Sequence, residues 1–326
     1  MVPAQKRVTS YDIAKASGVS QATVSYVLNR VEGQKISDAT RERVLAAAAE
    51  LNYRPYGPAR TLSLGHSRTV MFVLPSFPLG HAMNELLANL TSRLSHKGLK
   101  LLTYRPEPNE SVLQIASDLS PYGIISLVPL SPDQHRSLEQ QGIAVEVMAL
   151  STPAGEDADL TNPQERNGQM QIEYLLSKGH TRIGAAMPND ERLRPFSEPR
   201  LAGIDQALEE RSLDAAVVRV LHGDVDQAVH AVRNWVELGI TAVAAYNDDV
   251  AVEVLAGARR AGVRVPDQLA VIGLDDTPIA RQIDPTLTSV FTDMDHLAAR
   301  LVHHLVGETK PLRVKNNTHV VPRESA

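Results

Sequence analysis

The stretch TSYDIAKASGVSQATVSYVLN, residues 9–29, decides the fold of the N-terminal part of this chain. Its spacing of apolar and small residues predicts two short helices, Ser10–Ala16 and Gln21–Leu28, joined by a turn that contains a glycine. Thr9 and Asp12 match a capping box, because a hydroxyl at the helix start and a carboxylate three residues later can each accept a bond from an unpaired backbone amide. The pattern is that of a helix-turn-helix.

The two faces of this helical pair differ in chemistry. Small and apolar side chains at helical spacing face inward, and these are Ile13, Ala14, Val19, Val24, Val27 and Leu28. The outward face carries Gln21, Ala22, Ser25 and Tyr26. Such a face meets base edges when a recognition helix enters the DNA major groove. The alternative is a helical hairpin that packs on another domain, but the basic N-terminus favours DNA binding.

Length and charge limit what the rest of the chain can be. A chain of 326 residues with 43% hydrophobic residues has room for two or three domains with real cores. Residues 1–68 carry ten Lys and Arg against five Asp and Glu, a net of +5, whereas the remainder carries 23 against 33, a net of −10. Polyanion binding is therefore expected in the N-terminal part alone. The absence of Cys excludes disulfides and thiolate sites. The lack of a long apolar run predicts a cytoplasmic protein that does not enter a membrane.

A third helix and a linker are predicted after the helix-turn-helix. Ser37 can cap a helix over residues 38–52. The apolar side chains expected to cover the first two helices are Val44, Leu45, Ala48 and Leu51. The next segment, Tyr53–Ser67, contains two prolines and two glycines and is typical of a linker. Alternatively, a short helix begins at Pro58 and forms only on DNA, with Leu62 as an apolar wedge at a minor-groove base step.

From Thr69 onward, apolar runs alternate with amphipathic segments. The predicted strands are 69–75, 99–105, 123–129, 144–150, 182–187, 216–221, 241–246 and 268–273. The predicted helices are 82–97, 112–119, one from 132, 167–178, 200–211, 225–238 and 249–261. Near-continuous apolar strands separated by helices predict parallel sheets covered on both faces. Their number predicts two sheets, and the polar stretch Ser151–Arg166 is the expected boundary.

Polar residues follow two of these strands at the edge where ligands bind in such sheets. Asn247 and Asp248 follow one strand, and Asp275 and Asp276 follow another. Their amide and carboxylate groups suit a polyhydroxylated ligand, and Arg200 can hold a hydroxyl or an anionic group. The alternative for Asn247 or Asp248 is capping of the helix that follows.

Seven motifs in order give this chain a resemblance to a known family. They are VTSYDIAKASGVSQATVSYVLN (8–29), TRERVLAAAAELNYRP (40–55), SKGHTRIG (177–184), RLAG (200–203), AYNDDVA (245–251), VPDQLAVIGLDD (265–276) and PTLTSV (285–290). Over essentially its full length the chain resembles the lactose/galactose repressor (LacI/GalR) family of bacterial transcription regulators.

The resemblance implies an α/β fold in which a three-helix helix-turn-helix headpiece and a hinge precede a periplasmic-binding-protein-like body of two doubly wound parallel-sheet subdomains. The expected limits are 1–55 for the headpiece, 56–68 for the hinge helix and linker, 69–161 with 293–319 for the N-terminal effector subdomain, and 162–292 with 320–326 for the C-terminal one. The resemblance further implies a homodimer on a palindromic double-stranded DNA operator and a small-molecule effector, with a sugar as one candidate. Neither a cofactor, nor a metal, nor a catalytic residue is expected.

Site residues are carried over by position. The expected DNA-binding residues are Thr9, Tyr11, Ser20, Gln21, Ala22, Thr23, Ser25, Tyr26, Asn29, Ala59 and Leu62. The expected effector-binding residues are Phe77, His81, Phe196, Arg200, Tyr246, Asn247 and Asp275. The three aromatic side chains are candidates for stacking on a sugar ring, with ordinary packing as the alternative. His81 is a ligand contact, a metal ligand or an ordinary loop residue.

Two departures from the family pattern bear on function. Tyr26 stands where many members carry Arg, which predicts a different base preference at that position. Residues 80–83 lack the family's frequent aromatic pair, which weakens the case for a sugar. The sign of control is left open, since either induction or corepression fits the chain. A solute-binding protein would share the body but not the basic headpiece, and an enzyme would need a nucleophile–base pair or a phosphate loop that these motifs do not supply.

Overall fold

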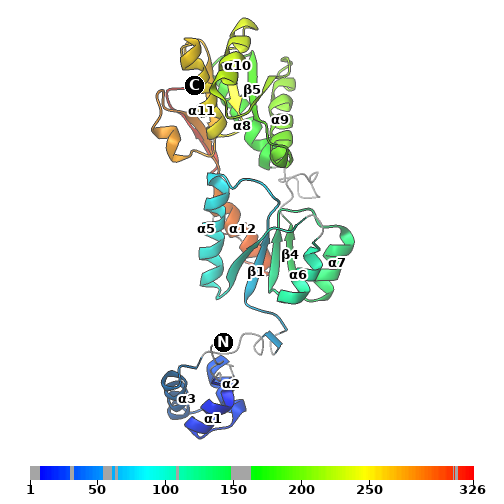
Figure 1. Ribbon diagram of the computed structural model, residues 1–326, viewed down its shortest axis with the longest axis vertical. Helices are drawn as coiled ribbons and strands as arrows, with labels where there is room; N and C mark the ends of the chain where they lie inside the picture. Colours follow the sequence, from blue (N-terminus) through cyan, green and yellow to red (C-terminus); the bar gives the residue numbers. More distant parts are fainter. Residues whose placement is uncertain are drawn as a thin grey trace, which may run out of the picture. The chain divides into compact units, whose positions relative to one another are not determined.

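The computed structural model describes residues 8–29, 33–53, 61–62, 65–107, 110–147, 163–310, 312 and 315–326 (Figure 1). The chain divides into two compact units, Met1–Arg68 and Thr69–Ala326. The boundary falls directly before the first strand, where the sequence changes from a helical to an alternating pattern.

Three helices form the described core of the N-terminal unit: α1 (Ser10–Ser17), α2 (Gln21–Asn29) and α3 (Asp38–Glu50). The predicted capping box is confirmed, because Thr9 accepts from the Asp12 amide and the Asp12 carboxylate accepts from the Thr9 amide. Gly18 ends α1 in the left-handed conformation at φ 67°, which a residue with a Cβ adopts only at a cost. The turn and its cap thus follow directly from the local sequence.

The headpiece core lies where the three helices meet. Its buried residues are Ile13, Ala14, Val24, Val27, Val44 and Ala47. The expectation that Leu45 covers the first two helices is wrong, because its side chain is 49% exposed. Successive helical residues point about 100° apart, so a core-facing Val44 turns Leu45 outward and brings Ala47, three residues on, to the inner face.

Only a small part of the predicted hinge is described. Ala59 and the expected helix start at Pro58 lie outside the described residues. Thr61 and Leu62 have helical backbone conformation, and the Leu62 side chain is 88% exposed. An apolar side chain of that size is usually buried, so its exposure is compatible with the predicted role as a wedge.

The first sheet of the body has four parallel strands in the order β2-β1-β3-β4. Its strands are β1 (Thr69–Val73), β2 (Lys100–Tyr104), β3 (Gly123–Ser126) and β4 (Ala144–Val147). The helices between them are α5 (His81–His96), α6 (Val112–Leu119) and α7 (Pro132–Gln140). Strands β1 and β3 are almost completely buried, as expected for the central strands of a sheet covered on both faces.

The second sheet has six strands in the order β10-β9-β8-β7-β5-β6. They are β5 (Ile183–Pro188), β6 (Val217–Leu221), β7 (Ala242–Ala245), β8 (Ala270–Leu274), β9 (Thr288–Phe291) and β10 (His319–Val321). Its helices are α8 (Pro163–Ser177), α9 (Arg194–Glu209), α10 (Val225–Glu237) and α11 (Asp248–Ala261), with short 3₁₀ turns at Glu191–Leu193 and Pro278–Arg281. Only β10 is antiparallel to its neighbour.

The chain passes between the two sheets after β9. Helix α12 (Met294–Leu305) packs against α5, β3 and β4 of the first sheet, beside α5 in Figure 1, whereas β9 before it and β10 after it belong to the second sheet. A Cβ on Gly123 would lie 2.8 Å from Leu305, so α12 lies directly on β3. The predicted subdomain limits at 161, 292 and 319 stay predictions.

One helix begins earlier than expected. Residues up to Arg200 were predicted as a loop, but α9 starts at Arg194 and contains Pro199. Pro195 lies in its first turn, where no intrahelical partner exists for the missing amide, and Pro199 removes one further bond. Phe196 is therefore held on the same helix as Arg200.

Candidate functional site

The outward face of α2 is built as the sequence predicted. Gln21, Ala22, Ser25 and Tyr26 are all exposed, while Val24 on the opposite side is fully buried. The Gln21 side-chain amide donates to Ser10 Oγ at 3.1 Å, so α1 fixes its direction. The face presents an amide, a hydroxyl and a phenol at the start of a helix, which are groups that hydrogen-bond base edges.

Several predicted DNA-binding residues also hold the helix ends. Ser20 Oγ accepts from the Thr23 amide at 3.1 Å and shares a 2.9 Å hydrogen bond with the Thr23 hydroxyl. Thr9 caps α1, and Tyr11 is 64% exposed on the first turn of that helix. The Asn29 side chain, like Ala59, lies outside what the structure describes. These caps keep the first turns of α1 and α2 ordered for contact with a polyanion.

In the body, Arg200 is the central polar residue of the predicted effector site. It is 4% exposed, donates through one terminal nitrogen to the Tyr246 carbonyl, and donates through the other to Gln164 Oε1. Its guanidinium lies 4.3 Å from the centroid of the Tyr246 ring, a cation–π geometry. Its Nε has no partner among the described residues. Arg200 is therefore rigidly oriented before any ligand arrives.

Close packing of two helices holds Arg200 in place. A Cβ on Gly168 of α8 would lie 2.2 Å from the Arg200 carbonyl oxygen, and a Cβ on Gly203 of α9 would lie 2.0 Å from the Glu165 carbonyl oxygen. Both contacts are with backbone atoms, so no side-chain rotation can relieve them. The two glycines thus permit the helix separation at which Arg200 on α9 reaches Gln164 on α8.

Asn247 and Asp275 follow the adjacent strands β7 and β8. Asn247 Oδ1 accepts from the Val250 amide at 3.0 Å, which confirms the capping interpretation. Its side-chain NH₂ is then the group that can reach a ligand. Asp275 has a backbone φ of 101°, a region that a residue with a Cβ adopts only under constraint.

The carboxyl group of Asp275 lies in an unusual electrostatic environment. Burial raises its pKa from 3.8 to about 7, the charge of Arg200 opposes that rise, and the charges of Asp248, Asp249 and Glu85 add to it. No described residue donates a hydrogen bond to this carboxylate. A partly buried carboxyl group without a donor is stabilised by a ligand that brings donors.

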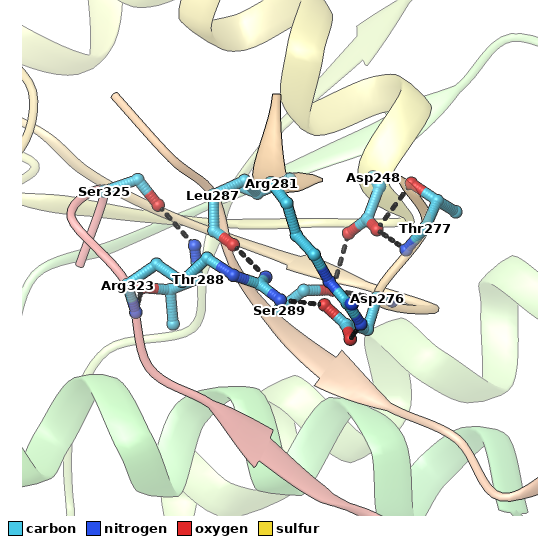
Figure 2. Close-up of polar contacts among 9 residues, drawn as sticks. All are labelled: Asp248, Asp276, Thr277, Arg281, Leu287, Thr288, Ser289, Arg323 and Ser325. Atoms are coloured by element: carbon cyan, nitrogen blue, oxygen red, sulfur yellow. Dashed lines mark hydrogen bonds and ion pairs between the residues drawn. The ribbon is translucent and has the colours of Figure 1, made fainter. Parts of the chain in front are cut away.

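The neighbouring acids Asp248 and Asp276, both candidates in the sequence, are used inside the protein (Figure 2). Asp248 is fully buried and accepts from Ser289 Oγ at 2.6 Å, from the Thr277 amide at 2.6 Å and from the Thr277 hydroxyl at 2.9 Å. Its pKa is raised by burial and lowered by these donors. Asp248 thus joins the start of α11 to the segment after β8 and to β9, and as a fully buried group it is closed to a ligand.

Asp276 is held between two arginines, as Figure 2 shows. Arg281 donates to one carboxylate oxygen at 2.7 Å, and Arg323 donates to the other. Arg323 also donates to the Leu287 carbonyl at 2.6 Å. The C-terminal segment is therefore bonded to the residue directly before β9. The expectation that all four residues after β7 and β8 suit a ligand is therefore wrong for two of them.

The aromatic candidates pack mainly against the protein. Phe77, after β1, and Phe196, on α9, meet edge to face with ring centroids 5.1 Å apart and an interplanar angle of 63°. Both are buried, and one face of Tyr246 is covered by Arg200. The Phe77–Phe196 contact joins the part of the body built on the first sheet to the part built on the second. The contacts of all three rings therefore fit ordinary packing better than stacking on a sugar ring.

His81 and Glu85 lie together at the start of α5. His81 is the first residue of that helix, and its Nε2 is 3.4 Å from Glu85 Oε1 one turn later. Both side chains are about two-fifths exposed, at 38% and 45%. His81 is thus a partner of Glu85 on the helix, and not a loop residue.

Comparisons with known proteins agree with this architecture. Residues 9–56 match the model of bacterial regulatory proteins of the lacI family, and residues 172–326 match the periplasmic binding protein-like domain. The transcriptional repressor PurR of Vibrio vulnificus is 27% identical over 95% of this chain and 93% of its own, and the regulator DegA of Bacillus subtilis is 26% identical over 97% and 95%. A crystal structure of the lac repressor dimer bound to operator and the anti-inducer ONPF aligns with a TM-score of 0.76 and 26% identity over 98% of this chain and 99% of that one.

The chain belongs to the lacI family. The matches extend from the helix-turn-helix through both sheets, so this lacI-family regulator is a DNA-binding transcription regulator with a periplasmic-binding-protein-like effector domain. It is not an enzyme. Among its described helices, none is both long and apolar enough to cross a bilayer. Within the described residues, no three His, Cys, Asp or Glu side chains converge in a way that could hold a metal ion.

Two features of the lacI-family regulator were not singled out from its sequence. Gln164 binds Arg200, but it lies in the polar stretch Ser151–Arg166, which was interpreted as the boundary between the two sheets. Glu85 influences Asp275 from a helix about 190 residues earlier in the chain. The only local signal for Glu85 was its position four residues after His81, which predicts a helical pair but not the direction that the pair faces.

Proposed function

We propose that this regulator is a repressor that binds a palindromic operator as a homodimer and leaves it when a small polar effector binds the body. The observation that carries the DNA-binding half is the exposed polar face of α2, with Gln21 already oriented by Ser10. The net charge of +5 over residues 1–68 favours contact with phosphates. The crystallised lac repressor, to which the chain is similar, is a dimer bound to operator.

Base recognition is assigned to the exposed face of α2. Gln21 can bond adenine through both side-chain atoms, whereas Tyr26 offers one hydroxyl and an aromatic edge. Leu62, at 88% exposure, is the apolar residue available to enter a minor-groove step. Because the partner is chromosomal DNA, the proposed place of action is the cytoplasm.

Effector binding is assigned to Arg200, Asn247 and Asp275. Asp275 supplies a carboxylate that no described residue satisfies, Asn247 supplies an NH₂ donor, and Arg200 supplies a fixed positive charge. These groups fit a small molecule rich in hydroxyl or amino groups, and sugars and related metabolites are the class to test.

Control by the effector requires that it bind the two states of the body unequally. Phe77, in the part built on the first sheet, meets Phe196, in the part built on the second, so a ligand bound between the two parts favours one relative position of them. Operator affinity then changes by the same factor as effector affinity. We propose that the effector releases the regulator from its operator. If the effector instead makes operator binding tighter, the effector is a corepressor.

The DNA-binding half is tested by selection of random duplexes with the full-length chain, followed by sequencing of the bound pool. An enriched palindrome is expected, with one half-site for each headpiece. A pool without enrichment, both alone and with candidate effectors, contradicts operator binding.

A matched pair of variants tests the assignment of α2. Tyr26→Ala should weaken binding to the selected palindrome by about 10–100-fold and relax the preference at one base pair, because a base contact contributes about 1–3 kcal/mol. Leu45→Ala is the control, since Leu45 is also exposed, at 49% against 37% for Tyr26, but lies on α3, outside the proposed interface. Uniform weakening across all sequences by Tyr26→Ala would mean that Tyr26 contacts the DNA backbone.

A further inference from the structure

The two residues that follow β8 share an uncommon backbone conformation. Asp275 has a φ of 101° and Asp276 has a φ of 48°, so two consecutive residues with a Cβ have positive φ values. Such residues keep this conformation only where the surrounding structure holds them in it. The Asp275 amide donates to the Val290 carbonyl at 2.8 Å, and the Asp276 amide donates to Ser289 Oγ at 3.1 Å. The backbone of this turn is therefore bonded to β9.

The side chain of Asp276 anchors the same turn, and its two arginine partners differ in burial (Figure 2). Arg281 and Arg323 each donate to one carboxylate oxygen of Asp276, which is itself buried. The Arg281 side chain is 66% exposed, whereas the Arg323 side chain is 12% exposed. Water and salt weaken an exposed ion pair, but a buried charge that loses its partner is strongly destabilised. Arg323 is therefore the partner on which the position of Asp276 depends.

The second sheet holds Arg323 in place. Its other terminal nitrogen donates to the Leu287 carbonyl at 2.6 Å, and its backbone amide donates to Thr288 Oγ1 at 2.9 Å. Two residues later, the fully buried Ser325 donates to the Val271 carbonyl at 2.6 Å and accepts from the Thr288 amide at 2.9 Å. Arg323 therefore comes from a segment that is bonded to β8 and to the start of β9, and both of its terminal nitrogens are bonded inside the protein.

We propose that Arg323 is a positioning residue for the effector: by holding Asp276, it keeps the turn from which the Asp275 carboxyl group meets the ligand. This inference rests on the proposed function, because it adds a residue to the effector site assigned there. Arg323 does not touch the effector in this arrangement. It acts through Asp276, which lies 47 residues earlier in the chain.

Loss of Arg323 should alter this turn without unfolding it. The Asp248 carboxylate accepts from the Thr277 amide at 2.6 Å and from the Thr277 hydroxyl at 2.9 Å, so the residue directly after the turn stays bonded to α11. Asp275 stays bonded to β9 through its amide. With both ends held and Asp276 released, the turn can relax toward a more common backbone conformation, which moves the Asp275 carboxyl group. Effector response should therefore fall by more than stability does.

The experiment measures release of full-length variants from the operator that the selection identifies. The probes are D-glucose, D-galactose, D-ribose, cellobiose, D-glucosamine and D-glucitol, and the variants are tested with the probe that releases the unmodified chain at the lowest concentration. Arg323→Gln should raise the concentration for half-release about tenfold or more, because it removes two charge-assisted hydrogen bonds. Arg323→Lys should raise it less, about threefold, since lysine keeps the charge but lacks the planar fork. Without a probe, both variants should bind the operator as tightly as the unmodified chain does.

Arg281→Gln is the matched control. Arg281 donates to the other carboxylate oxygen of Asp276, but from a side chain that is mostly exposed. This variant should change the half-release concentration by less than about twofold. Equal losses in Arg281→Gln and Arg323→Gln would mean that any partner of Asp276 has the same effect, and would overturn the assignment to Arg323.

The outcomes separate this inference from the proposed function. If Arg323→Gln responds to the probe as the unmodified chain does, or folds but loses its response only together with operator binding, Arg323 is not a positioning residue while effector control stands. If Arg323→Gln does not fold, Arg323→Lys is compared with Arg281→Lys, and an equal response of these two variants overturns the inference. If no probe releases an operator complex that does form, the proposed release by an effector is overturned, and this inference falls with it.

Discussion

Gly203→Ala tests how the helix packing positions the effector site. The added Cβ would lie 2.0 Å from the Glu165 carbonyl oxygen and 2.6 Å from the carbonyl carbon, whereas ordinary contact begins at 3.4 Å. The backbone of α9 must therefore move from α8 by about 1.4 Å, the difference between 3.4 and 2.0 Å. No rotamer change can absorb this shift, since both sides of the contact are backbone.

The energetic and functional consequences follow from that displacement. Overpacking costs about 1–3 kcal/mol, and the gain in helix propensity from Gly to Ala offsets about 1 kcal/mol of it. A net loss of up to about 2 kcal/mol should lower the unfolding midpoint of the body by up to about 8 °C. Arg200 lies one turn before Gly203 and binds Gln164 beside Glu165, so the same shift breaks that hydrogen bond and disorders the site. Effector response should fall by more than the stability loss alone explains.

The assay uses the single tryptophan of the chain. Trp235 is fully buried on α10 and donates to the Val217 carbonyl at 2.8 Å, so its fluorescence reports unfolding of the second sheet in urea. Ala202→Gly is the stability control, because Ala202 is exposed on the same helix and its change isolates the helix-propensity difference of about 1 kcal/mol. If Gly203→Ala unfolds at the same urea concentration as the unmodified chain and still responds to effector, the close approach of α8 and α9 does not position Arg200.

Two further predictions concern titration and helix capping. The pKa of Asp275 is raised to about 7, so folding favours its protonated form, and the stability that this provides is lost as pH rises from the ordinary carboxyl range through 7. As pH rises from 5 to 8, the free energy of unfolding of Asp275→Asn, measured in urea, should therefore increase by roughly 2–3 kcal/mol relative to that of the unmodified chain. Parallel pH curves for the two proteins would refute the assignment. Thr9→Ala should destabilise the headpiece by about 1 kcal/mol through loss of the α1 cap, as measured by the melting of helical circular dichroism, while Thr9→Ser keeps the cap; equal melting of the two variants would show that the cap does not stabilise α1.

Several parts of the site were predictable because their causes are local in sequence. The capping box at Thr9, the left-handed turn at Gly18 and the exposed face of α2 all depend on residues within one or two helical turns. Asn247 as the cap of α11 follows in the same way from its place directly after a strand. The strand–helix alternation likewise identified two sheets, because parallel strands need helical crossovers between them.

Other features depend on residues that are far apart in sequence. Asp248 and Asp275 look alike in the sequence, since each follows a buried strand. Ser289, 41 residues away, and Thr277, 29 residues away, donate to the carboxylate of Asp248, while Asp275 receives no such donors from the described residues. No local pattern shows which carboxylate is left for a ligand.

The sequence alone determined the helices, their caps, the two-sheet fold and the DNA-reading face, because short-range spacing and backbone preference set each of them. The tertiary structure decided that α12 joins the first sheet, that Arg200 is fixed by glycine-permitted packing, and that Glu85 lies within electrostatic reach of Asp275. The physical reason is that hydrogen bonding, burial and charge interaction depend on distance in space. Once the chain is folded, that distance is unrelated to separation along the sequence.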